Sequence, residues 1–170
     1  MKITDIKTFL MMAGSPASKE STSWSARNWC FVKVYTDEGI IGLGEGSGWP
    51  RVVETAINDL KPIVIGEDPM NIERIWQKML VSTMGAGMTG TPGSGSMNAI
   101  DMALWDIKGK ALNTPVWNLL GGKVRDRIRA YGHASTPERA LELKERGLTA
   151  VKTGGVHRTV EKVDGIRKAV

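Results

Sequence analysis

The chain has 170 residues, of which 41% are hydrophobic and 24% are charged, a composition typical of a globular protein. Its net charge of +5 is small, and the most basic stretch, residues 123–129, is interrupted by Val124, Asp126 and Ile128, which argues against a nucleic-acid surface. Cys30 is the only cysteine, so an internal disulfide and a cysteine-rich zinc site are excluded. No apolar run is long enough for a membrane span or a signal region, so we expect a cytoplasmic protein without membrane contact.

The first part of the sequence predicts an antiparallel meander of three strands. The predicted strands are residues 3–12, 29–35 and 40–45. Side chains alternate in the second strand, so Cys30 shares a face with Val32 and Val34 and is expected to be a buried, inert thiol. Residues 36–39 have turn composition, with Gly39 free to take a positive φ. Residues 14–28, which are rich in serine and also contain alanine, Gly14 and Pro16, predict a long loop between the first two strands.

Apolar residues at helical spacing predict three helices after the meander. They are residues 51–60, residues 72–84, and a stretch from Ser96 or Asn98 to Ala111. We expect Pro62 to end the first helix and Asn71 to cap the second.

The stretch 85–96 holds five glycines and one proline, so we expect no regular structure there. A phosphate-binding loop is disfavoured, because the stretch lacks a Gly-Lys-Ser/Thr ending and no strand precedes it. A flexible loop beside a pocket and a plain connector remain as interpretations.

After residue 127 the pattern changes to strand, helix, strand, helix. The predicted elements are strands at 128–132 and 149–153 and helices at 137–146 and 160–170. This order, with short links, is typical of a parallel sheet or a (β/α)₈ barrel. Only about 43 residues follow residue 127, whereas a complete barrel needs about 250, so we expect the chain to end inside a domain. The expected domains are an α+β domain over residues 1–125 and the start of a TIM barrel over residues 126–170.

Two basic side chains stand where barrel enzymes carry their chemistry. His133 follows the first short strand of this second region, and Lys152 lies at the end of the second strand. From spacing alone, each is more often a surface or packing residue than a functional one. Asp101 and Asp106 are five residues apart on one predicted helix, so they point in different directions and make a poor metal pair. We expect Asp101 to lie in the first turn of that helix, where the helix dipole favours a carboxylate.

Taken together, the motifs resemble the mandelate racemase and muconate lactonizing enzyme family of the enolase superfamily. The matching segments are Val32-Lys-Val-Tyr-Thr-Asp-Glu-Gly39, Gly42-Leu-Gly-Glu45, Gly66-Glu-Asp-Pro69, Ile100-Asp-Met-Ala-Leu-Trp-Asp-Ile-Lys-Gly-Lys110, Pro115-Val-Trp-Asn-Leu-Leu-Gly-Gly122, Arg125-Asp126 and Arg129-Ala-Tyr131. Their order and spacing cover essentially the whole chain. The block at residues 100–110, followed by Leu-Leu-Gly-Gly, is the most specific of them.

The resemblance implies an α+β capping domain over a (β/α)₈ barrel that binds a small carboxylate substrate. In the family, the loop between the first two strands and the loop after the third strand close over the substrate. Here these loops are residues 14–28 and 46–50, so Trp24, Ser47 and Trp49 are implied substrate-binding residues, and His133 is placed with them.

The resemblance also implies a metal and an assembly. The family binds Mg²⁺ through three acidic residues on the third to fifth barrel strands, which we expect beyond this chain, so no metal ligand is predicted within it. In the superfamily, a base removes the proton α to a carboxylate, and Mg²⁺ stabilises the enediolate that forms. A homo-oligomer is the corresponding expectation for the assembled protein.

One departure from the family pattern bears on the reaction. Racemases and cycloisomerases of the family end the second barrel strand with Lys-x-Lys, in which the second lysine is a base. Here the strand ends with Lys152-Thr153-Gly154, and a glycine cannot move a proton. The resemblance therefore favours a lyase, a sugar-acid dehydratase of the galactonate dehydratase type, in which a histidine elsewhere does acid–base work. Lys152 is then the predicted catalytic residue, holding a substrate carboxylate as a point charge.

Two alternatives stay open. One is a racemase, epimerase or cycloisomerase of the same fold, and the other is a non-catalytic truncated product. The chain of 170 residues alone is expected to be inactive.

Overall fold

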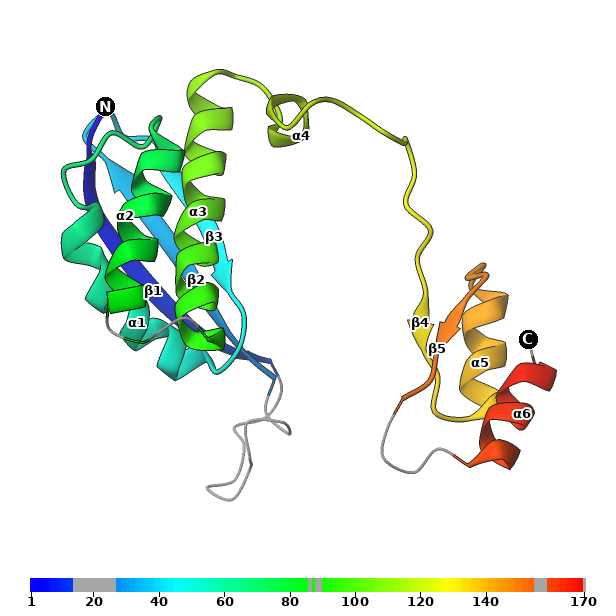
Figure 1. Ribbon diagram of the computed structural model, residues 1–170. Coiled ribbons are helices and arrows are strands. Elements are labelled where there is room, and N and C mark those ends of the chain that lie inside the picture. Colours follow the sequence, from blue (N-terminus) through cyan, green and yellow to red (C-terminus); the bar gives the residue numbers. More distant parts are fainter. Residues whose placement is uncertain (14–26, 86, 88–89, 155–158, 170) are drawn as a thin grey trace. The chain divides into compact units, whose positions relative to one another are not determined.

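The computed structural model describes residues 1–13, 27–85, 87, 90–154 and 159–169. The elements are β1 (Ile3–Ala13), β2 (Arg27–Thr36), β3 (Ile41–Gly46), α1 (Pro50–Val64), α2 (Ile72–Gly85), α3 (Thr91–Ala111), α4 (Val116–Leu119), β4 (Gly132–His133), α5 (Pro137–Glu145), β5 (Val151–Lys152) and α6 (Val160–Ala169). The chain divides into two compact units, Met1–Gly122 and Lys123–Val170 (Figure 1). No helix of the described residues is long and apolar enough to cross a membrane.

The first unit contains the predicted meander. Its three strands pair antiparallel in the order β1-β2-β3, with Phe9 opposite Phe31 and Lys33 opposite Leu43. The backbone N–H of Gly39 donates to the Thr36 carbonyl in the turn after β2, and Gly39 has a φ of 80°, as its position in the sequence predicts. The α+β fold class expected from the sequence is therefore confirmed for this unit.

Helices α1 and α3 pack on one face of this sheet, and α2 packs against both of them (Figure 1). The face carries the residues that alternation assigns to it, and Cys30, Val32 and Val34 have no exposed surface. The helices contribute the rest of the core through Val53, Ile57, Leu60 and Val64 of α1, Ile72, Ile75 and Met79 of α2, and Met97, Ala99, Ile100, Ala103, Leu104 and Ile107 of α3. Each helix thus buries one apolar stripe in a common core, α1 and α3 against the sheet and α2 against α1 and α3.

The largest correction to the sequence prediction concerns the glycine-rich stretch. Helix α3 begins at Thr91, so the part of this stretch from Thr91 onward is helical rather than irregular. Pro92 lies in the first turn, where proline is favoured because its missing N–H needs no partner. Gly95 is required by packing, since a Cβ there would lie 2.3 Å from the carbonyl oxygen of Ser47. Asp101 consequently lies in the middle of the helix and not in its first turn.

The predicted end of the first helix and the predicted lengths of two strands were also wrong. Pro62 does not end α1, which continues to Val64, and the completely buried Val64 side chain stabilises this last turn. In the second unit, the strands predicted at 128–132 and 149–153 shorten to two residues each, β4 and β5. A short apolar run shows that a strand is present, but only its neighbours in a sheet decide how many residues pair.

The contact between α3 and β3 is exceptionally close. A Cβ added to Gly42 would lie 2.0 Å from the carbonyl oxygen of Ala103, and one added to Gly44 would lie 1.9 Å from that of Ala99. Real side chains do not approach a backbone oxygen so closely. The Gly-x-Gly pattern of β3 therefore lets the helix backbone lie directly on the strand, with alanines as the facing residues.

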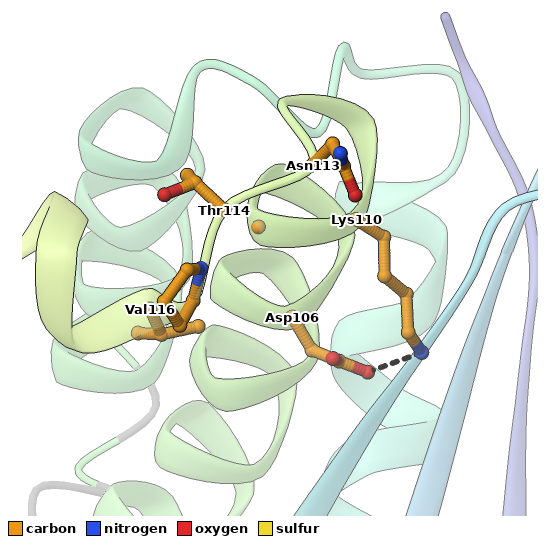
Figure 2. A pocket seen from close by; sticks show the side chains of 7 residues that line it. Asp106, Lys110, Asn113, Thr114 and Val116 are labelled. Carbon is orange, nitrogen blue, oxygen red and sulfur yellow. Dashed lines mark hydrogen bonds and ion pairs between the residues drawn. The ribbon is translucent and has the colours of Figure 1, made fainter.

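The same helix also binds the outer edge of the sheet. Strand β3 is an edge strand, and the Leu43 N–H donates to Asp106 Oδ2 at 2.8 Å. Lys110 Nζ donates to the Ile41 carbonyl at 2.7 Å and forms an ion pair with Asp106 at 2.7 Å (Figure 2). Two side chains of α3 thus satisfy backbone groups of β3 that would otherwise present an open edge for strand pairing.

The second unit contains one parallel strand pair and two helices. Gly132 is opposite Val151, and His133 is opposite Lys152. The buried residues Ala134, Ala140, Leu143 and Ile166 form a small core between the strands and helices α5 and α6. Thr136 caps α5 by accepting a hydrogen bond from the Arg139 N–H. The short parallel β–α units expected from the sequence are confirmed.

We predict that Gly44→Ala destabilises the protein strongly, because neither the Ala99 carbonyl nor the strand can move without breaking the contact between α3 and β3. Overpacking of this kind costs roughly 1–3 kcal/mol or more. Gly85→Ala is the matched control, since no atom lies within 4 Å of the added Cβ and its φ is not in the left-handed region. Urea unfolding monitored by tryptophan fluorescence measures both variants, and equal midpoints would contradict the close approach.

A second prediction concerns the half-buried Asp101. Burial raises the pKa of its carboxyl above the ordinary value of 3.8, the charge of Glu73 raises the pKa further, and a hydrogen bond with Trp105 opposes both. The folded state thus binds this proton more tightly than the unfolded state does. The resulting stabilisation is complete below the unfolded-state pKa and is lost as pH rises through the folded-state pKa.

Asp101→Asn, which keeps a carbonyl oxygen for Trp105, should therefore raise the free energy of unfolding at pH 7. The gain should shrink as pH falls toward 3.8, the ordinary pKa of the group. Unfolding curves of wild type and variant between pH 4 and pH 8 measure this difference. Glu73→Gln is the control and should give a smaller gain of the same sign, whereas a gain that grows on acidification would refute the assignment.

Candidate functional site

The strand pair of the second unit brings two predicted site residues together. Because β4 and β5 are parallel and His133 is in register with Lys152, these side chains are neighbours on one face of the pair. The other face packs on helices: a Cβ at Gly132 would meet Leu143 at 2.6 Å, and Ala134 is buried. Because one face of the strand pair packs on the helices, the opposite face is left to solvent. His133 and Lys152 are exposed on that face.

A third side chain, to which the sequence analysis gave no role, lies beside them. Tyr131 precedes His133 by two residues, and the two ring centroids are 6.4 Å apart with an interplanar angle of 53°. Lys152 Nζ lies 5.9 Å from the centroid of the Tyr131 ring. We call Tyr131, His133 and Lys152 the strand-face cluster. The period of two along an extended chain was the signal that places Tyr131 beside His133.

The chain segment before the cluster is anchored by Arg129. Its Nε donates to Thr149 Oγ1 at 2.8 Å, and its Nη2 donates to the Thr149 carbonyl at 2.5 Å. The Ala134 N–H donates to the Lys152 carbonyl at 3.0 Å on the other side of the cluster. The two chain segments are therefore held together before and after the cluster, and a lysine ammonium, an imidazole and a phenol ring share one exposed surface. The ammonium and the imidazole can bind a carboxylate by charge and by hydrogen bonds.

The predicted substrate-binding residues of the first unit lie on the segment between β3 and α1. Ser47 is exposed, while its carbonyl lies against Gly95 of α3. Trp49 is 66% exposed, and its carbonyl accepts the hydrogen bond of the Val53 N–H at the start of α1. Trp24 lies outside the described residues. The backbone of this segment is thus fixed by α3 and α1, and the Trp49 side chain projects into solvent.

Potential metal ligands and nucleophiles are few. The described residues contain no group of three or more His, Cys, Asp or Glu side chains that could hold a metal ion. They therefore do not fit the Mg²⁺ site of the family. Cys30 is fully buried, and burial raises the pKa of its thiol to about 11, so the thiolate that would act as a nucleophile is scarce at neutral pH.

A pocket also opens at the C-terminal end of α3 (Figure 2). It is lined by Asp106, Gly109, Lys110, Asn113, Thr114, Pro115 and Val116. Its two charged side chains bind each other and the edge of β3, as described above. We therefore interpret its polar lining as part of the contact between helix and sheet, and the strand-face cluster remains the better candidate for chemistry.

Sequence comparison identifies the first unit. Residues 4–121, more than half of the chain, match the domain described as "Mandelate racemase / muconate lactonizing enzyme, N-terminal domain". The chain belongs to this family. The resemblance drawn from the motifs at residues 32–45 and 100–122 is therefore confirmed, and the first unit is the family's N-terminal domain.

Two curated relatives are similar to part of this chain. The chain is 49% identical over 113 residues to a D-galactonate dehydratase of Klebsiella pneumoniae, a match that covers 65% of this chain and 29% of the relative. It is 47% identical over 106 residues to the D-galactonate dehydratase of Verminephrobacter eiseniae, covering 61% and 27%. The chain therefore spans less than a third of the curated relatives that it matches.

Solved structures of the superfamily match almost the whole chain. A 3,6-anhydro-D-galactonate cycloisomerase from Zobellia galactanivorans has a TM-score of 0.86 at 32% identity, covering 99% of this chain and 48% of that one. A member of the enolase superfamily from Salmonella Typhimurium has a TM-score of 0.81 at 31% identity, covering 99% and 51%. The chain thus spans about half the length of these family members.

We predict that Trp49→Ala changes the free energy of unfolding by less than about 0.5 kcal/mol, because the side chain is mostly exposed and only its backbone takes part in the helix start. Trp76→Ala is the control, since Trp76 packs against the core of the first unit and should cost at least about 1 kcal/mol. Chemical unfolding measures both. Equal losses would show that Trp49 is a packing residue rather than a side chain available to a ligand.

Proposed function

We propose that the chain forms the capping domain, residues 1–125, and the first barrel strands, residues 126–170, of a sugar-acid dehydratase. The observation that carries this proposal is the 49% identity over 113 residues to a D-galactonate dehydratase. The strand-face cluster supports it, because a carboxylate substrate needs a positive charge beside it and Lys152 supplies one next to His133. Trp24, Ser47 and Trp49 are proposed as substrate-binding residues of the capping domain.

The proposed reaction begins with removal of the proton α to the carboxylate. Negative charge then develops on the carboxylate oxygens, and a fixed positive charge nearby stabilises the transition state more than the ground state. Lys152 is suited to this role because an ammonium is a compact point charge on an exposed face. His133 lies beside it, where its imidazole can donate a hydrogen bond to the same carboxylate.

Mg²⁺, which the family generally uses, would supply further stabilisation of the oxyanion. Since the described residues contain no fitting ligand group, we assign no step to the metal. Loss of a hydroxyl from the neighbouring carbon, protonated by a general acid to leave as water, would complete the dehydration. Neither this acid nor the base that accepts the α proton is assigned to a residue of this chain.

A cycloisomerase or racemase of the same family is the second candidate. The similarity of fold to the 3,6-anhydro-D-galactonate cycloisomerase favours it. The strand end Lys152-Thr153-Gly154 weighs against it, because a glycine at the third position cannot serve as the second base. The two reactions share the first proton transfer and differ in what leaves or adds afterwards.

The test uses the longest reading frame that contains this chain, incubated with Mg²⁺ and a panel of acid sugars that includes D-galactonate. We expect formation of a 2-keto-3-deoxy acid, measured by its carbonyl adduct with semicarbazide. We also expect Lys152→Met to lower kcat/KM roughly 10²–10³-fold, the usual cost of removing one preorganised charge contact. Lys152→Arg should restore activity only in part, because a planar guanidinium does not replace a compact ammonium.

The same assay run in deuterated water separates the alternatives. Exchange of the α proton without loss of water would support a racemase or epimerase and refute the dehydratase. A folded protein that neither exchanges this proton nor dehydrates any acid sugar would support a non-catalytic role. Wild-type turnover by Lys152→Met would remove Lys152 from the mechanism.

A further inference from the structure

The residue of the strand-face cluster without an assigned role is Tyr131. Alternation places it on the same face of the strand as His133, and the ring is 56% exposed, so it does not belong to the small core under Gly132 and Ala134. Burial therefore does not account for its position. What it contacts is its two neighbours in the cluster, His133 and Lys152.

The lysine reaches back toward this ring. Lys152 is in register with His133, yet its Nζ lies 5.9 Å from the Tyr131 centroid, two residues earlier on the neighbouring strand segment. Arg129, two residues before Tyr131, is held by two hydrogen bonds to Thr149. The cation that lies over the Tyr131 ring is the Lys152 ammonium.

We propose that Tyr131 is a positioning residue for Lys152, an inference that rests on the proposed function of that lysine. The negative face of the aromatic ring attracts the ammonium and restricts a side chain that otherwise samples many rotamers. The charge is then held beside His133 before a carboxylate ligand arrives, so less freedom is lost on binding. The ring rather than the phenol hydroxyl carries this effect.

The contact itself is tested in the chain as it stands, with ¹³C-labelled lysine and NMR. A ring 5.9 Å from Nζ should shift the Lys152 Cε protons upfield. The shift should persist in Tyr131→Phe and disappear in Tyr131→Leu, while Lys152→Met identifies the resonance by its loss. Lys33, whose Nζ lies 5.4 Å from the Phe9 ring in the first unit, is the internal control and should not change. A Lys152 signal that is the same in Tyr131→Leu and wild type overturns the proposal.

The functional consequence is tested in the longest reading frame that contains this chain. Tyr131→Leu should lower kcat/KM about two- to fivefold, the effect of one exposed cation–π contact. Tyr131→Phe should match wild type, and Tyr131→Leu should have no further effect when Lys152 is already Met. Equal losses in both backgrounds, or a loss in Tyr131→Phe, overturn the positioning role. Full activity of Lys152→Met would instead refute the proposed function and leave the NMR contact intact.

Discussion

The close approach of α3 to β3 is the constraint on which the first unit depends. The backbone oxygens of Ala99 and Ala103 occupy the space that side chains at Gly44 and Gly42 would fill. Once these backbones are in contact, Asp106 and Lys110 reach the edge of β3 and bind its free N–H and C=O groups. Helix α3 therefore packs on the face of the sheet and also hydrogen-bonds to its edge. Both contacts depend on the small residues between α3 and β3.

The same contact sets the segment that carries Ser47 and Trp49. Gly95 brings α3 against the Ser47 carbonyl, and the Trp49 carbonyl starts α1 through Val53. The backbone of this segment is thus determined by two helices, while its side chains are left exposed.

In the second unit, alternation along a strand likewise separates packed residues from exposed ones. Gly132 and Ala134 pack on the helices, and Tyr131, His133 and Lys152 face away from them. In both places packing fixes the backbone and leaves neighbouring polar or aromatic side chains free to meet a ligand.

What the sequence could and could not predict depends on whether a feature is local or rests on contacts between distant segments. Alternation around Cys30, Val32 and Val34 predicted the meander and its buried face, since a period of two is a local property. The start of α3 was missed because glycine signals a loop unless the neighbouring chain is known, and here the reason for Gly95 lies 48 residues away at Ser47. His133 and Lys152 were found at strand ends, whereas the contact of Tyr131 with Lys152 needed the register of β4 against β5. Contacts between segments distant in sequence account for each of these failures.

The proposed chemistry depends on side chains at strand ends rather than on the scaffold. This chain resembles a dehydratase at 49% identity over its first part and matches the fold of a cycloisomerase with a TM-score of 0.86, so one backbone arrangement accompanies both activities. We propose that the two activities differ in a small number of groups that exchange protons. In this chain the decisive position follows Lys152-Thr153, where Gly154 leaves one cation on the strand instead of two. A single ammonium can hold a carboxylate but cannot deliver protons to both faces of a carbon, and for that reason we propose elimination rather than racemisation.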